Sequence, residues 1–137
     1  DEQELLPADP NAPQTWMDLA LPKLEDARKT LEADVYAGAV SQAYYAMFYA
    51  CRAALLTQGL YLKKHSATID KFRELLVLTG EIEKSYLTLL GSGQTAREKS
   101  DYEPFTPTTR ADAEKALASA ESFIARMQTL VEKQTPA

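Results

Sequence analysis

The stretch Ser41-Gln-Ala-Tyr-Tyr-Ala-Met-Phe-Tyr-Ala-Cys-Arg-Ala-Ala-Leu-Leu56 decides the fold of this chain. Its larger apolar side chains recur at intervals of three and four residues, which is the period of a buried helix face. The alanines between them allow a neighbouring helix to approach closely. The stretch therefore predicts the central helix of a bundle, with buried positions at Val40, Tyr44, Met47, Phe48, Cys51 and Leu55.

The tyrosines of this stretch carry hydroxyl groups that need hydrogen-bond partners once they are buried. Tyr44, Tyr45 and Tyr49 span too wide an arc of a helix for all three rings to face one core. At least one ring should reach a groove or an interface, although packing within the core is the alternative interpretation. Arg52 is the only charged residue of the stretch, which hints that this helix also serves a function.

Length and composition are typical of one globular domain. The chain has 137 residues, 45% of them hydrophobic and 26% charged, enough to bury a single core. It contains no apolar run of the roughly 18–20 residues that a membrane span needs, and its first residues do not have the pattern of a signal peptide. Cys51 is the only cysteine, so an internal disulfide is excluded and a cytoplasmic location is predicted.

The hydrophobic pattern predicts an all-α, up-and-down bundle of four to five helices. Residues 1–12 have no apolar period and are interpreted as a flexible N-terminal arm. Residues 13–134 are predicted to form the bundle.

The first predicted helix covers about 13–33, with Pro22 causing a kink or a late start. The second covers about 35–57. Capping predicts a third helix that starts after Ser66 and a last helix that starts after Thr106 or Thr109, while Gly91-Ser-Gly93 should break or bend the fourth.

Two groups of polar residues are candidates for function. The first is the loop Lys63-Lys-His65, and the second is the turn Arg97 to Tyr102. Because Arg97 and Asp101 are four residues apart, they share a helix face and can form an ion pair. The alternative interpretations are a surface ion pair without function and a histidine that merely flanks a helix cap.

Several common chemistries are excluded by the residues present. One histidine and one cysteine cannot form a histidine/cysteine metal site, and no cofactor is predicted. Gly91-Ser-Gly93 lacks the lysine that follows a phosphate-binding glycine loop. The net charge of −5 argues against a broad nucleic-acid surface but allows a small basic pocket.

The order of these motifs resembles that of the small prokaryotic HEPN-domain proteins. The resemblance extends over about residues 16–127. It implies a helical bundle that forms homodimers, is often encoded beside a minimal nucleotidyltransferase partner, and belongs to toxin–antitoxin or other defence systems. It rests on Ala43-Tyr-Tyr-Ala-Met-Phe48, Arg52-Ala-Ala-Leu-Leu56, Lys64-His-Ser66, the Phe72 helix and Arg97-x-x-x-Asp-Tyr102.

The active ribonucleases of that family use an Arg-x(4–6)-His motif, in which arginine stabilises phosphate charge and histidine acts as acid or base. Here Arg97 is followed by Asp101 and Tyr102, and the sole histidine, His65, lies elsewhere. The resemblance therefore implies a protein that binds a nucleotide, RNA or a nucleotidyltransferase and lacks the usual cleavage reaction. Two alternatives stay open: a metal-independent ribonuclease toxin in which His65 folds back towards Arg97, and a purely structural interaction module. The predicted ligand-binding residues are Arg97, Asp101, Tyr102, His65, Lys64 and Tyr45.

Overall fold

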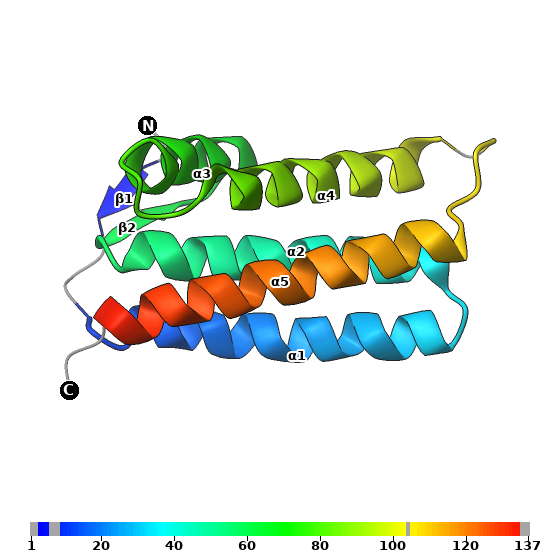
Figure 1. Ribbon diagram of the computed structural model, residues 1–137, viewed down its shortest axis with the longest axis horizontal. Helices are drawn as coiled ribbons and strands as arrows, with labels where there is room; N and C mark the ends of the chain where they lie inside the picture. Colours follow the sequence, from blue (N-terminus) through cyan, green and yellow to red (C-terminus); the bar gives the residue numbers. More distant parts are fainter. Residues whose placement is uncertain (1–2, 6–8, 104, 135–137) are drawn as a thin grey trace.

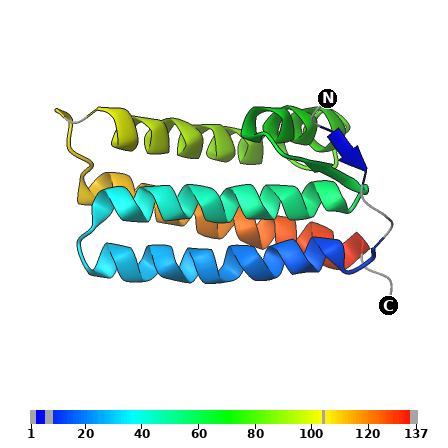
Figure 2. The same ribbon diagram turned by 180° about the vertical axis from the view of Figure 1, so that it is seen from behind.

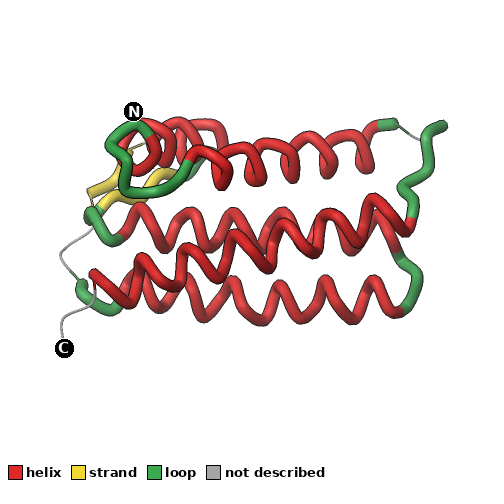
Figure 3. The backbone as a smooth tube through the Cα atoms, in the orientation of Figure 1, coloured by secondary structure: helices red, strands yellow, loops and turns green. Residues whose placement is uncertain are grey.

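A computed structural model describes residues 3–5, 9–103 and 105–134 and shows the predicted all-α, up-and-down bundle (Figure 1). Long helices that follow one another in the bundle run in opposite directions. A shorter helix lies at one end, beside a two-stranded ribbon (Figure 3). The helices are α1 Ala12–Glu32, α2 Tyr36–Leu56, α3 His65–Phe72, the π-helical turn η1 Arg73–Val77, α4 Lys84–Tyr102 and α5 Arg110–Gln134; the strands are β1 Gln3–Leu5 and β2 Leu60–Leu62.

Helix α2 is the centre of the bundle, as its sequence predicts. It packs against α1, α4 and α5, and Figure 2 shows it between α4 and α1 with α5 behind. Cys51 is buried, as predicted. Because α2 meets helices on several sides, its buried set is wider than one amphipathic stripe. The large side chains among its fully buried residues are Tyr44, Phe48, Met47, Leu55 and Val40.

Helix α4 continues through Gly91-Ser-Gly93, so the predicted break at these glycines is wrong. Gly93 is buried against α2, and a Cβ atom added there would overlap Met47 Cε. Glycine thus lets α4 approach α2 without displacing the terminal methyl group of Met47, which a side chain at this position would have to move. The segment from Arg97 to Tyr102 is part of the same helix, and Arg97, four residues after Gly93, lies on the same helix face.

Of two further predicted helix starts, the one for α3 is wrong and the one for α5 is confirmed. Ser66 is not the N-cap of α3, because that helix begins at His65 and its N-cap is Lys64. The connector predicted before it contains β2, which pairs antiparallel with β1. Thr109, in contrast, caps α5 as predicted: the Asp112 backbone N–H donates to its hydroxyl (3.1 Å) and its own N–H donates to the Asp112 carboxylate (2.9 Å). This reciprocal pair is a capping box.

The N-terminal region also departs from expectation. Helix α1 starts at Ala12 and runs through Pro22 without interruption, so the late start is wrong. Of the predicted arm, residues 1–2 and 6–8 lie outside the described residues, while Gln3–Leu5 forms β1. The flexibility of the arm stays a prediction.

Gly59 has the predicted left-handed conformation, with φ 73°, although α2 ends three residues before it.

Candidate functional site

Tyr44 and Tyr45 form the floor of the candidate site. They are adjacent on α2, so their rings point in different directions. Tyr44 is fully buried, whereas Tyr45 is half-buried and packs at the edge of the core. The two rings meet edge to face with centroids 5.5 Å apart. Burial raises the pKa of Tyr44 to about 12, so its hydroxyl keeps its proton at neutral pH and stays available for a hydrogen bond.

That hydroxyl holds the only histidine of the chain. The Tyr44 Oη and His65 Nδ1 atoms are 3.0 Å apart, and the donor is set by the imidazole tautomer. The imidazole also stacks on Phe48, with ring centroids 3.8 Å apart and an angle of 17° between the planes, and it meets the edge of Tyr45. These contacts fix the orientation of the ring. Tyr44 contacts Nδ1 and not Nε2, the second ring nitrogen.

The surroundings of His65 favour the neutral form of its imidazole. Its burial lowers the pKa of the imidazole below the usual 6.5, and the positive charges of Arg52 and Arg97 lower it further. A neutral imidazole has one donor and one acceptor nitrogen. The ring can therefore exchange a hydrogen bond or a proton with a bound group, and a nearby anion would raise its pKa again.

Arg97 reaches the same two tyrosines from α4. Its Cζ atom lies 5.0 Å from the centre of the Tyr45 ring and 5.8 Å from that of Tyr44. The predicted ion pair with Asp101 is present, with Nε and Oδ2 3.5 Å apart. That distance is too long for a good hydrogen bond, and Arg97 Nε is accordingly buried without one. The side chain is 24% exposed, so its outer N–H groups can meet a ligand.

Arg52 is a second arginine near His65, and its role is different. Its Nη2 atom donates to the backbone carbonyls of Leu62 and Lys63, at 3.2 and 3.1 Å. Its Cζ atom also lies 4.6 Å from the centre of the Phe48 ring. These contacts tie α2 to β2 and fix the residues that lead into α3, so Arg52 positions His65.

The predicted site residues are only partly brought together. Tyr45, His65, Arg97 and Asp101 gather on one side of the bundle. Lys64 is the exposed neighbour of His65, but Tyr102 is 75% exposed at the end of α4. The sequence did not indicate that Tyr44 and Phe48 contact His65. His65 lies more than 15 positions further along the chain, and no local pattern connects residues so far apart. Arg52 was singled out as the only charge in an apolar run, but its contacts with Leu62 and Lys63 were not predicted.

Other kinds of site receive no support from the described residues. No three of their histidine, cysteine, aspartate or glutamate side chains come close enough to hold a metal ion. None of the helices built from them combines the length and the apolar character that crossing a membrane requires.

The structure places this chain among small all-α domains built as an up-and-down helical bundle. The chain belongs to the HEPN-domain family, whose model matches residues 13–130. It is 35% identical over 115 residues to "Putative toxin MJ0605" of Methanocaldococcus jannaschii, covering 84% of this chain and 85% of the relative. It is 29% identical to a "UPF0332 protein" of Thermotoga maritima, covering 85% and 89%.

Solved structures support the same fold. The archaeal HEPN homologue ST0689 matches with a TM-score of 0.69 and 19% identity, over 87% of this chain and 97% of the other. TT1696 from Thermus thermophilus matches with a TM-score of 0.69 and 24% identity, over 90% and 98%. At these identities the likeness concerns the fold alone.

Proposed function

We propose that this protein is a toxin-like HEPN protein that binds short single-stranded RNA or a nucleotide at Arg97, His65 and Tyr45. One observation carries the proposal. Arg97 and His65, which lie on different helices, both contact the rings of Tyr44 and Tyr45. A cation, a neutral imidazole and a half-buried aromatic ring are thereby placed side by side within an acidic protein.

Each group has a role in such binding. The outer N–H groups of Arg97 can donate to a phosphate, and its ion pair with Asp101 is weak enough to be exchanged for that contact. The half-buried Tyr45 ring offers a face for a base, as aromatic side chains do in proteins that bind single strands. His65 supplies a hydrogen-bonding nitrogen whose orientation Tyr44 fixes.

The toxin-like assignment rests on family membership and on the name of the relative from Methanocaldococcus jannaschii. As part of the same proposal, the protein acts as a homodimer and pairs with a minimal nucleotidyltransferase in a toxin–antitoxin or defence system. Sedimentation analysis of the purified chain tests the dimer. Co-expression with a nucleotidyltransferase encoded beside it tests the partner.

Fluorescence anisotropy with a labelled single-stranded RNA tests the binding site. Arg97→Gln removes the proposed phosphate contact, and Arg28→Gln is the matched control, because Arg28 pairs with glutamates on α1 and α5 away from the site. We expect the first variant to weaken binding roughly tenfold or more, since a charge-assisted hydrogen bond is lost, and the control to change it less than twofold. Equal affinities in both variants would refute this site.

A ribonuclease is the second candidate, and the Tyr44–His65 hydrogen bond favours it. Active histidines are commonly oriented by a hydrogen bond at one ring nitrogen, so that the other can transfer a proton. RNA cleavage in the presence of a metal chelator, compared among the natural chain, His65→Gln and Arg97→Gln, decides between the two functions. Cleavage that depends on His65 and Arg97 would establish the enzyme; binding without cleavage would leave the first function.

A further inference from the structure

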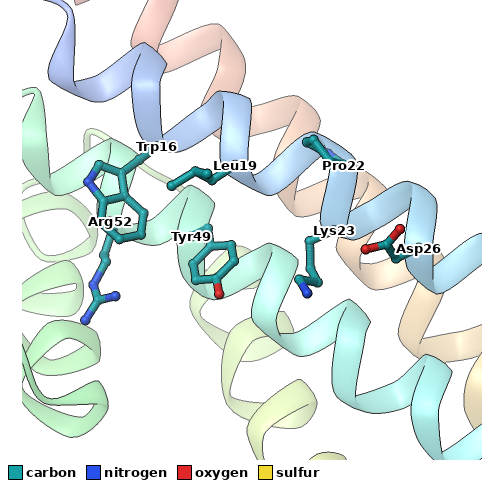
Figure 4. A pocket seen from close by; sticks show the side chains of 7 residues that line it. All are labelled: Trp16, Leu19, Pro22, Lys23, Asp26, Tyr49 and Arg52. Carbon is teal, nitrogen blue, oxygen red and sulfur yellow. The ribbon is translucent and has the colours of Figure 1, made fainter.

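A groove between α1 and α2 lies beside the candidate site. Its volume is about 460 Å³, which is within the range of about 300–1,000 Å³ that small-molecule sites occupy. Figure 4 shows Trp16, Leu19 and Lys23 from α1 and Tyr49 from α2 along its walls. Leu19 is 49% exposed, so apolar surface is open to solvent there.

Aromatic rings connect this groove with the candidate site. Trp16 and Tyr49 have ring centroids 5.6 Å apart, and Tyr49 is 6.4 Å from Tyr45. Tyr45 and Tyr49 are one helical turn apart on α2, so their rings follow one another along the same face. The series Trp16, Tyr49 and Tyr45 is therefore a continuous aromatic track that ends below Arg97.

Positive charge lies at both ends of the groove (Figure 4). The Cζ atom of Arg52 lies 5.0 Å from the centre of the Trp16 ring, and Arg52 Nε is buried without a hydrogen-bond partner. Lys23 lines the groove from α1, with Asp26 beside it one helical turn further along. In a chain of net charge −5, cations beside aromatic faces are the combination that binds bases and phosphates.

We infer that the groove binds a base of the same RNA, one or more nucleotides away from the phosphate at Arg97. This inference rests on the proposed function and extends it to a second subsite. A purely apolar partner helix would gain little from Lys23, Asp26 and Arg52, which it would have to desolvate. A base instead presents an aromatic face to Trp16 and polar edges to the charged groups.

Trp16 makes the subsite directly measurable, because it is the only tryptophan of the chain. The natural protein is titrated with a five-nucleotide RNA and with an abasic ribose-phosphate chain of the same length. Tryptophan fluorescence and anisotropy of the labelled chains are followed together. We expect the RNA, and not the abasic chain, to quench Trp16, and a two-nucleotide RNA to bind about 5- to 100-fold more weakly than the longer one, as the loss of a stacked base predicts.

The other outcomes separate the two proposals. RNA binding that requires Arg97 but leaves Trp16 fluorescence unchanged would overturn the subsite and keep the proposed function. The absence of any RNA binding would overturn both. A Trp16 signal that changes with protein concentration without RNA would mean that a second copy of the chain covers the groove, which also overturns the subsite.

Variants provide an independent test. Tyr49→Leu removes the middle ring of the track and keeps an apolar side chain, and it should weaken binding of the five-nucleotide RNA about 5- to 100-fold. Tyr36→Leu is the matched control, because Tyr36 lies at the first turn of α2 beside Arg110. Helical content and thermal unfolding confirm that both variants fold. An affinity of Tyr49→Leu within twofold of the control would refute the track.

Discussion

The two glycines of α4 test how closely this helix approaches α2. Gly91 and Gly93 lie in the same continuous helix. A Cβ atom at Gly91 would meet no atom within 4 Å, whereas one at Gly93 would overlap Met47 Cε and lie 3.7 Å from Tyr44 Cδ1. Alanine at either position gains the same helix propensity, so any difference between the variants reports the packing against α2.

The expected magnitudes follow from these surroundings. Gly91→Ala should stabilise the protein by about 0.5–1 kcal/mol, because alanine is the better helix former and loses less backbone entropy. Gly93→Ala has this gain too, but its methyl group must displace the terminal methyl of the fully buried Met47; because methionine is flexible, the cost should lie at the low end of the roughly 1–3 kcal/mol typical of overpacking a core. We expect Gly93→Ala to be less stable than Gly91→Ala by about 1 kcal/mol.

Urea unfolding, followed by circular dichroism, measures both free energies of unfolding on the same scale. A Gly93→Ala variant as stable as Gly91→Ala would refute the close approach of α4 to α2. The result also bears on the site, because Gly93 precedes Arg97 by one helical turn and shares its face. If the approach is as close as the structure has it, Gly93→Ala should in addition weaken RNA binding, while Gly91→Ala should not.

Three further predictions concern single groups. His65 has a lowered pKa in the folded state, so the unfolded chain binds more protons below about pH 6.5. Stability should therefore fall as the pH drops below that value, and thermal melts of His65→Gln should lack this part of the decline. Burial raises the pKa of the Cys51 thiol, so a thiol reagent should label the native protein only as fast as it opens, and labelling within seconds would contradict the burial. Thr109→Ala should reduce the free energy of urea unfolding by about 0.5–2 kcal/mol through loss of the α5 cap, and an unchanged value would refute the capping role.

The helices were predictable because their signals are local. The periodic apolar positions of α2 and the Thr109 cap each depend on residues a few positions apart, and both are present as predicted. The effect of Gly91-Ser-Gly93 was not predictable in this way. Glycine weakens a helix by itself, but burial against Met47 gives Gly93 a use that appears only once two helices are packed.

In the site, too, contacts between residues close in the sequence were predictable, and contacts between distant residues were not. The Arg97–Asp101 ion pair follows from a spacing of four on one helix, and the structure contains it. The Tyr44–His65 hydrogen bond joins residues 21 positions apart and depends on where β2 turns into α3. Helix α3 starts at His65, whereas capping predicted a start after Ser66, and no capping rule indicates that the imidazole stacks on Phe48.

The aromatic rings explain how an acidic chain can keep cations available for an anion. If carboxylates neutralised Arg97 through paired hydrogen bonds, a phosphate would have to break those bonds before it could bind. The guanidinium lies instead over Tyr44 and Tyr45, and its ion pair with Asp101 has no hydrogen bond at Nε. Cation–aromatic contacts stabilise the charge without neutralising it. Burial is the main cause of the lowered His65 pKa, and the charges of Arg52 and Arg97 lower it further; those charges would also attract RNA, and a bound phosphate should raise the pKa of His65 again.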